Sequence, residues 1–321
     1  MPLHYDPEFY KALEPQIPLL YANPKPPVHD VAGRRARLST LLAEILPGVP
    51  DTPDVDVSLH QVKAPDGASV AVSRYVKKDS DSGKIPVPAI LEIHGGGMIC
   101  GDVASMDKVL KMQASESGIQ VFAVGYRLAP EHKDPTLVED CYAALEWMNQ
   151  NAQTFNIDPK RIAVKGGSAG GGLAAGVALL ARDRGLSPPL AKQILISPML
   201  DDRNLTPNLA LEQFATWNNE DNITGWTALL GDQAGGDGVS CYAAPARVES
   251  VEGLPPTYID IGGLDIFRDE VFKYAARIAE ANIPIEFHLY PGVPHSFEGV
   301  GGGLEVTKMA KANRLKAIKA F

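Results

Sequence analysis

One serine stands where a nucleophile would be expected. It is Ser168, the centre of the G-x-S-x-G pattern that runs from Gly166 to Gly170. The apolar residues 162–164 before it predict a short buried strand, and a helical pattern begins directly after it. So tight a turn strains the central residue and needs small neighbours, and the N–H groups of a helix start favour negative charge. An acyl-transfer enzyme would place its nucleophile there, although the pattern alone is weak evidence in a chain with 30 glycines.

A second glycine-rich stretch also follows a buried-strand candidate. Residues 87–93 are mostly apolar and end in His94-Gly95-Gly96-Gly97-Met98. Consecutive glycines let the backbone approach a ligand and direct N–H groups at it, which beside a serine nucleophile would make an oxyanion hole. Phosphate binding fits badly, because neither a P-loop Lys-Ser/Thr nor a helix-opening G-x-G-x-x-G is present. We interpret His94 as a scaffold residue that hydrogen-bonds this loop, rather than as a base.

A serine nucleophile needs a general base, and the base needs a carboxylate that orients it. Two histidines follow Ser168 in the chain. His288 lies inside a predicted strand and is held on one of its faces. His295 lies on the loop after that strand's carboxyl end and can reach the site, so we predict His295 as the base.

Four aspartates compete for the role of the orienting carboxylate. Asp265 comes just after the predicted strand 257–261 and is the predicted acid, in the chain order Ser, Asp, His. Asp260 lies inside that strand, and Asp269 fits better as a helix N-cap. Asp201 also follows a strand's carboxyl end and is the alternative.

Alternating strand and helix patterns would position these residues. Period-two segments at 54–63 and 68–77, joined by Pro65-Asp66-Gly67, predict a hairpin at a sheet edge. The later pattern predicts strands at 87–93, 120–125, 162–164, 193–197, 257–261 and 285–290, with helices at 105–117, 137–151, after Ser168, at 269–281 and from 304. This order predicts an α/β fold with a mostly parallel central sheet and helices on both faces. Ligands bind such sheets at the carboxyl ends of the strands, where both glycine stretches lie.

Two regions depart from this alternation. Residues 1–50 contain two helical stretches among several prolines, and we expect them to form a cap on a catalytic domain of residues 51–321. The cap would either pack on the core or act as a lid over a pocket. Residues 201–247 predict an insertion with short helices that adds to the cap or a pocket wall, and residues 78–84 predict a solvated loop. We expect substrate contacts from Gly97, Met98, Phe214 and Trp217.

Composition excludes several classes of protein. The net charge of −9 argues against nucleic acid and anionic membranes as partners. No apolar run approaches the ~18–20 residues of a membrane span, and no secretory signal is visible at the N-terminus, so we predict a cytoplasmic protein. The three cysteines, Cys100, Cys141 and Cys241, are too few and scattered for a disulfide framework or a zinc site, and are expected as buried thiols.

Together the motifs resemble the hormone-sensitive-lipase-type family of α/β-hydrolase esterases. The segments that carry the resemblance are His94-Gly95-Gly96-Gly97, Tyr126-Arg127-Leu128-Ala129-Pro130-Glu131-His132, Gly166-Gly167-Ser168-Ala169-Gly170-Gly171, Leu264-Asp265-Ile266-Phe267-Arg268-Asp269-Glu270 and Pro294-His295-Ser296-Phe297. The resemblance implies Ser168 as nucleophile, His295 as base and Asp265 as its orienting acid. It also implies an oxyanion hole from the N–H groups of Gly95, Gly96 and Ala169, an α/β-hydrolase fold with an N-terminal helical cap, and a possible homodimer.

Two positions depart from the family's pattern. The residue before the serine is commonly Asp and here is Gly167, and the residue after the histidine is commonly Gly and here is Ser296. Neither change removes a catalytic group.

The expected reaction is hydrolysis of short- to medium-chain carboxylic esters through an acyl-enzyme, with no metal or cofactor. Lactones and amides share the transition state, so a lactonase or amidase with the same triad is the alternative. A third reading is a non-catalytic small-molecule receptor, which would be expected to lose a triad member, usually the histidine. Here His295 is present.

Overall fold

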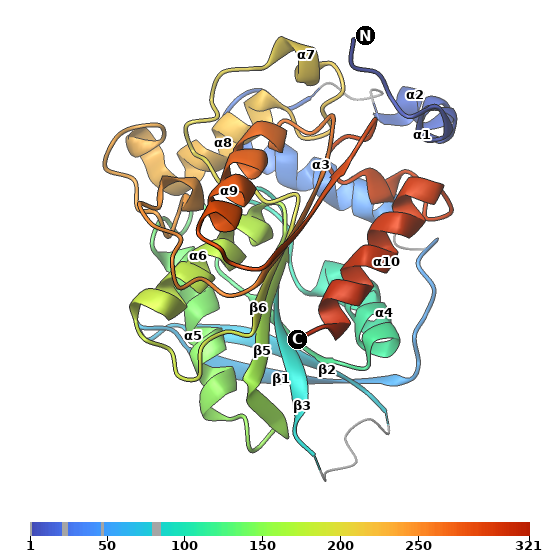
Figure 1. The fold of residues 1–321 in the computed structure, drawn as a ribbon. Coiled ribbons are helices and arrows are strands. Elements are labelled where there is room, and N and C mark those ends of the chain that lie inside the picture. Colours follow the sequence, from blue (N-terminus) through green and yellow to red (C-terminus); the bar gives the residue numbers. More distant parts are fainter. Residues whose placement is uncertain (1, 21–24, 46–47, 79–84) are drawn as a thin grey trace.

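An eight-stranded sheet carries the fold of the computed structural model, which describes residues 2–20, 25–45, 48–78 and 85–321 (Figure 1). The strand order is β1-β2-β4-β3-β5-β6-β7-β8. β2 pairs antiparallel with β1 and β4, and the other neighbouring pairs are parallel. The edge hairpin and the mostly parallel sheet agree with the prediction, whereas the pairing of β2 with β4 was not predicted. The strands are β1 (Val55–Lys63), β2 (Ser69–Lys77), β3 (Val87–Ile93), β4 (Gln120–Gly125), β5 (Ile157–Gly167), β6 (Lys192–Ile196), β7 (Thr257–Gly262) and β8 (Ile285–Tyr290).

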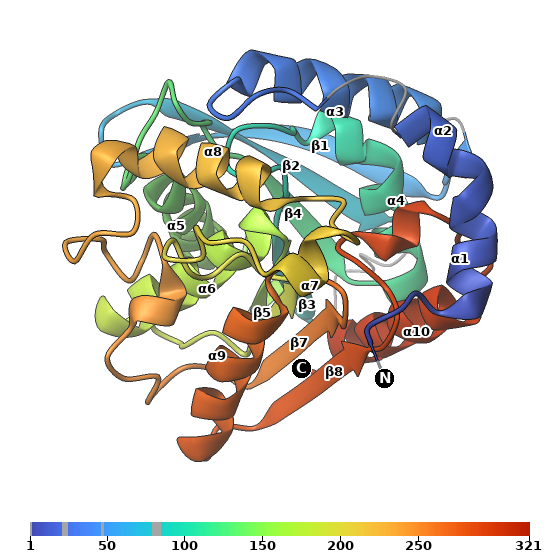
Figure 2. The same cartoon turned by 90° about the horizontal axis from the view of Figure 1, so that it is seen from above.

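Helices cover both faces of this sheet (Figures 1 and 2). One layer contains α5 (Thr136–Gln150), α6 (Ala169–Asp183) and α9 (Arg268–Glu280), and the other contains α4 (Asp107–Ser117) and α10 (Glu305–Lys319). The predicted α/β-hydrolase architecture is therefore confirmed, with helix ends within about two residues of the prediction. The predicted N-cap at Asp269 is wrong, because α9 begins at Arg268 with Phe267 as its cap, and Asp269 instead accepts a hydrogen bond from Arg268.

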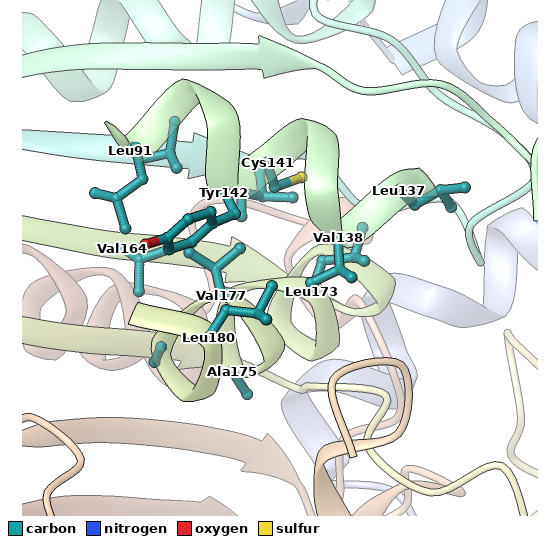
Figure 3. Packing of buried hydrophobic residues seen from close by; sticks show 14 of the residues in the cluster. Leu91, Leu137, Val138, Cys141, Tyr142, Val164, Leu173, Ala175, Val177 and Leu180 are labelled. Carbon is teal, nitrogen blue, oxygen red and sulfur yellow. The ribbon is translucent and has the colours of Figure 1, made fainter. Parts of the chain in front are cut away.

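The main core lies between the sheet and the α5–α6 layer. Figure 3 shows Leu91 of β3 and Val164 of β5 facing Tyr142 of α5 and Val177 of α6, all of them buried. On the opposite face a second buried cluster joins four strands to α10; it comprises Ile90, Ile119, Ala163, Ile194, Tyr258, Ala317 and Ile318. Because the central strands are covered on both faces, they are apolar along most of their length rather than alternating.

The N-terminal region packs at the carboxyl ends of the strands and comprises α1 (Pro7–Leu13), α2 (Ile17–Leu20) and α3 (Val31–Ile45). Phe9 and Leu13 of α1 form a buried cluster with Val293 and Phe297 from the loop that follows β8. Before α1, the backbone N–H of Asp6 donates to the Gly292 carbonyl (2.8 Å). α3 lies across the carboxyl ends of the strands, in the upper half of Figure 1. Residues 21–24 and 46–47 of the predicted cap fall outside the described residues, as do 79–84 of the predicted loop.

Residues 201–247 contain the short helices α7 (Leu209–Glu212) and α8 (Asn219–Leu230). α8 begins with a capping box, in which Asn218 and Asp221 each accept a hydrogen bond from the other's backbone N–H. The three cysteines are free, with Cys100 and Cys141 buried and Cys241 half-buried. In the part of the chain that the structure describes, no helix has the length and apolarity to cross a bilayer.

Leu91→Ala should lower the free energy of unfolding by about 3 kcal/mol, because its side chain is fully buried on a central strand and its removal leaves a cavity. Leu59→Ala is the matched control, since Leu59 lies on the edge strand β1 with 65% of its surface exposed, and it should cost less than about 0.5 kcal/mol. Guanidinium denaturation of both variants measures the difference. Equal losses would contradict this assignment of the core.

Candidate active site

Four polar or glycine-rich segments meet at the carboxyl edge of the parallel sheet. The glycine loop follows β3, Ser168 follows β5, Asp265 follows β7 and His295 follows β8. In a parallel sheet such residues share one edge although they lie far apart in the sequence. The structure thus brings the three predicted triad residues together.

Ser168, His295 and Asp265 form a continuous hydrogen-bonded chain. Ser168 Oγ lies 2.9 Å from His295 Nε2, and His295 Nδ1 lies 2.6 Å from Asp265 Oδ2. The second carboxylate oxygen of Asp265 accepts a hydrogen bond from the Phe267 N–H (2.9 Å). Asp265 and His295 are buried, whereas Ser168 is partly exposed. This is the geometry in which an imidazole can take the serine proton while a fixed carboxylate orients the ring.

The turn at Ser168 has the strained geometry that its sequence predicts. Ser168 has φ 56° and ψ −124°, a region that side-chain-bearing residues rarely adopt, and α6 begins at the next residue. Glycine is required at Gly166, where a Cβ atom would lie 2.1 Å from the Gly170 carbonyl oxygen. At Gly170 a Cβ would lie 2.1 Å from the Ile93 oxygen, so the helix start presses against the end of β3. This contact brings the glycine loop to the serine.

The loop after β3 lies beside Ser168. A Cβ at Gly95 would lie 3.3 Å from the Ser168 Cβ, and Gly96, with φ 118°, turns so tightly that its Cβ would meet the Cys100 oxygen at 2.1 Å. In the described part of the chain, the N–H groups of Gly95, Gly96 and Ala169 donate to no protein acceptor. Unpartnered N–H groups near a nucleophile can stabilise the negative oxygen of a tetrahedral intermediate.

His94 hydrogen-bonds the glycine loop, as predicted for a scaffold residue. Its Nδ1 donates to the Gly95 carbonyl (2.8 Å), and its ring stacks on Tyr126 with the centroids 4.2 Å apart. The Tyr126 hydroxyl donates to the His94 carbonyl (2.8 Å). Burial lowers the pKa of His94, which favours the neutral ring.

Opposing effects act on the pKa of His295. Burial lowers it, but the negative charges of Asp265 and Glu298 and the Asp265 hydrogen bond raise it, and the net shift is upward from 6.5. Glu298 stays anionic because Arg314 of α10 pairs with it and offsets the effect of burial on its pKa. The His295 carbonyl accepts a hydrogen bond from Thr216 Oγ1 (2.7 Å), which ties the loop to the 201–247 segment. Neither Glu298 nor Thr216 was predicted from the sequence. Glu298 lies three residues after His295 and could have been considered for that reason, whereas Thr216 has no such signal.

A cavity of about 420 Å³ opens at Ser168. Its apolar lining comprises Leu38, Leu41, Leu42, Met106, Ile196 and Trp217. Leu38 and Leu42 of α3 also line an adjoining hollow of about 750 Å³. A lid over a pocket was one of the two roles expected for residues 1–50, but the lining leucines of α3 were not predicted, because they depend on how the helix docks.

Two of the four predicted substrate contacts lie on the cavity wall. Gly97 and Trp217 line it, and they touch each other so closely that a Cβ on Gly97 would lie 2.1 Å from the indole ring. Met98 and Phe214 are corrections to the prediction. Met98 is fully buried in the main core, and Phe214 is turned away against the ring of Tyr5, 4.9 Å between centroids.

The remaining candidates for base and acid lie elsewhere. Asp201 pairs with Arg203 (2.7 Å), and Asp260 pairs with Arg314 (2.6 Å). His288 lies on the β8 strand, with Nε2 3.0 Å from Glu286. The structure therefore removes Asp201 as the alternative acid.

The two departures from the family's pattern have different surroundings. At Gly167 a Cβ would meet no atom closer than 3.9 Å, so the position has room for a side chain. Ser296 has φ 55° and ψ 35°, the left-handed region in which glycine is unstrained. A serine there is accommodated with local strain beside His295.

Comparison with known proteins decides the family. Residues 90–299 match the model of a family described as having the alpha/beta hydrolase fold. The chain belongs to the hormone-sensitive-lipase-type α/β-hydrolases. It is 34% identical to the esterase LipI of Mycobacterium tuberculosis over 233 residues, which cover 72% of each chain. It is 28% identical to an ethyl acetate hydrolase of Pseudomonas putida, over 87% of each chain.

Solved structures of this family agree. A bacterial heroin esterase shares 38% sequence identity with the chain and superposes with a TM-score of 0.87, over 98% of this chain and 97% of that one. These similarities support a carboxylesterase function for this member of the family.

Replacing Asp265 should lower the pKa of His295. In Asp265→Asn the carboxylate no longer raises that pKa, while the effect of burial remains. Asp201→Asn is the matched control and should leave His295 unchanged, because Asp201 pairs with Arg203. A pH titration of the imidazole resonances by NMR measures both. A His295 pKa unaffected by Asp265→Asn would contradict the coupling described above.

Proposed function

We propose that the chain hydrolyses short- to medium-chain carboxylic esters through an acyl-enzyme on Ser168. The observation that carries this proposal is the hydrogen-bonded chain from Ser168 through His295 to Asp265, at a turn next to unpartnered backbone N–H groups. A complete triad of this kind supports catalysis rather than a receptor role.

Each step follows from the positions of these groups. His295 Nε2 takes the proton of Ser168 Oγ as that oxygen attacks the ester carbonyl carbon, and the carbonyl oxygen becomes the oxyanion. The N–H groups of Gly95, Gly96 and Ala169 stabilise this oxyanion. His295 then gives its proton to the departing alcohol oxygen as the C–O bond breaks. Water, deprotonated by His295, attacks the acyl-enzyme, and the acid leaves as Ser168 recovers its proton.

The cavity supports substrates of modest size. Its volume of about 420 Å³ falls in the lower part of the range for small-molecule sites, ~300–1,000 Å³. The apolar wall formed by α3 and Trp217 suits an alkyl or aryl group. The printed names of relatives point the same way, since one is an ethyl acetate hydrolase and another an arylesterase.

Lactone and amide hydrolysis by the same triad stays an alternative that an assay decides. The predicted cytoplasmic location and homodimer also stay predictions, which cell fractionation and light scattering check.

Ser168→Ala should reduce hydrolysis of p-nitrophenyl esters by about a thousandfold or more, because the acyl-enzyme can no longer form. A series from acetyl to decanoyl, with a lactone and an anilide alongside, should show a maximum at short or medium acyl chains. Ser69→Ala is the matched control, since Ser69 lies on the exposed hairpin, and it should retain the parent's activity. Activity that survives in Ser168→Ala would overturn the mechanism.

The kcat/KM for ester hydrolysis should fall as the pH is lowered through a midpoint that lies above 6.5. The base must be neutral to accept the serine proton, and the pKa of His295 is raised above its ordinary value of 6.5. In Glu298→Gln this midpoint should move to lower pH, because Glu298 contributes to the upward shift. Glu286→Gln is the control and should leave it in place, since Glu286 interacts with His288 instead. A kcat/KM profile with its midpoint below 6.5 would contradict the assignment.

A further inference from the structure

Arg35 of α3 reaches the back of the glycine loop. Its Nε donates to the Ile99 carbonyl (2.7 Å), and its Nη2 donates to the Ala129 carbonyl (3.0 Å). Ile99 and Ala129 are both fully buried. A single guanidinium from the N-terminal region thus holds two main-chain oxygens of the catalytic domain.

Glu131 fixes the orientation of that guanidinium. Its two carboxylate oxygens accept from Nη1 and Nη2 of Arg35, both at 2.7 Å, in the bidentate arrangement that arginine alone provides. The hydrogen bond from Arg35 lowers the pKa of Glu131 to about 2, so the pair is charged throughout the neutral pH range. Both side chains are partly exposed, and an exposed ion pair adds little to stability by itself. Its geometric effect is to aim the remaining N–H groups at the two carbonyls.

The Ile99 carbonyl belongs to the turn that carries the oxyanion donors, and Ala129 lies on a second segment that is hydrogen-bonded to this turn. The N–H groups of Ile99 and Cys100 both donate to the Gly96 carbonyl, at 3.1 and 2.9 Å. The Ala129 N–H donates to the Met98 carbonyl (3.0 Å), which joins the second segment held by Arg35 to the same turn. A shift of Ile99 or Ala129 is therefore transmitted through main-chain hydrogen bonds to Gly96.

Arg35 acts from outside the cavity at Ser168. It lines the adjoining hollow of about 750 Å³ but not the cavity that contains the serine. The neighbouring Arg34 makes a different connection, from α3 to Asp221 of α8 (2.9 Å). The region thus has contacts that join it to the catalytic domain without touching the glycine loop.

We propose that Arg35 is a positioning residue for the oxyanion hole, through which the N-terminal helix α3 fixes the Gly95–Gly96 turn in its reactive geometry. This inference rests on the proposed ester hydrolysis and adds a residue to it. Misplacing catalytic donors by about 1 Å can cost up to a hundredfold in rate. An anchor for the N-terminal region alone would instead affect stability and substrate binding.

The test compares Arg35→Ala, Arg35→Lys and Glu131→Gln with Thr224→Val. Thr224 accepts a hydrogen bond from the His29 N–H (2.9 Å), so Thr224→Val loosens the N-terminal region at a contact that involves neither Arg35 nor the Ile99 and Ala129 carbonyls. Lysine keeps the charge of Arg35 but not the planar fork, so Arg35→Lys should behave like Arg35→Ala. Glu131→Gln keeps the guanidinium and should show a smaller effect.

Two readouts separate positioning from anchoring. The first is hydrogen exchange of the Ile99, Cys100 and Ala129 amides, which should be at least about fivefold faster in Arg35→Ala and unchanged in Thr224→Val. The second is kcat for an ester and its thionoester, since sulfur is a poorer hydrogen-bond acceptor than oxygen in the oxyanion hole. We expect Arg35→Ala to lower kcat on the ester about tenfold or more, to change KM less than about threefold, and to reduce the preference for the ester over the thionoester.

Unchanged amide exchange with an unchanged ester-to-thionoester ratio in Arg35→Ala would overturn the proposal, and would identify Arg35 as an anchor only. If Arg35→Ala does not fold, Arg35→Lys and Glu131→Gln carry the same comparison. Failure of the proposed function shows separately, as a parent protein that hydrolyses neither substrate. Even if the parent protein is inactive, the amide exchange rates still test whether Arg35 restrains the glycine loop.

Discussion

The strained turn at Ser168 is the constraint on which the rest of the site depends. A residue with φ 56° can lead directly from β5 into α6 only if the helix start is free of side chains on the side that meets the sheet. At Gly170 even one methyl group would collide with the Ile93 carbonyl. The close approach of the start of α6 to the end of β3 also brings the glycine loop, which follows β3, beside the serine. Nucleophile and oxyanion donors are thus positioned by one packing contact.

The base and its acid satisfy a different requirement, that buried polar groups find partners. Asp265 uses one oxygen for the Phe267 N–H and the other for His295, whose carbonyl in turn accepts from Thr216. Because these groups are shielded from water, their charges act strongly on one another, and Glu298 adds to the upward shift in the pKa of His295. The loop that carries the histidine is therefore held in position, and the charges around the ring raise its pKa.

The N-terminal region contributes to both of these loops. Phe9 of α1 shares a buried cluster with Phe297, and the Asp6 N–H donates to the Gly292 carbonyl, so both contacts reach the segment around His295. α3 lines the cavity with leucines and reaches the glycine loop through Arg35. α3 combines the two roles considered for residues 1–50, because Val31 and Leu38 pack against the main core while Leu38 also lines the cavity. Removing the region would disturb the base and the oxyanion loop as well as the cavity wall.

The sequence by itself determined the type and order of the elements and the residues that converge at the carboxyl edge of the sheet. Those features depend on near neighbours: the apolar period of a strand, the glycines of a tight turn, and Ser168, Asp265 and His295 each following a strand. Only the tertiary structure decided that Met98 and Phe214 turn away from the cavity and that Arg35, Thr216 and Glu298 support it. Most of these contacts join segments far apart in the chain and depend on how irregular segments dock, which no local pattern encodes.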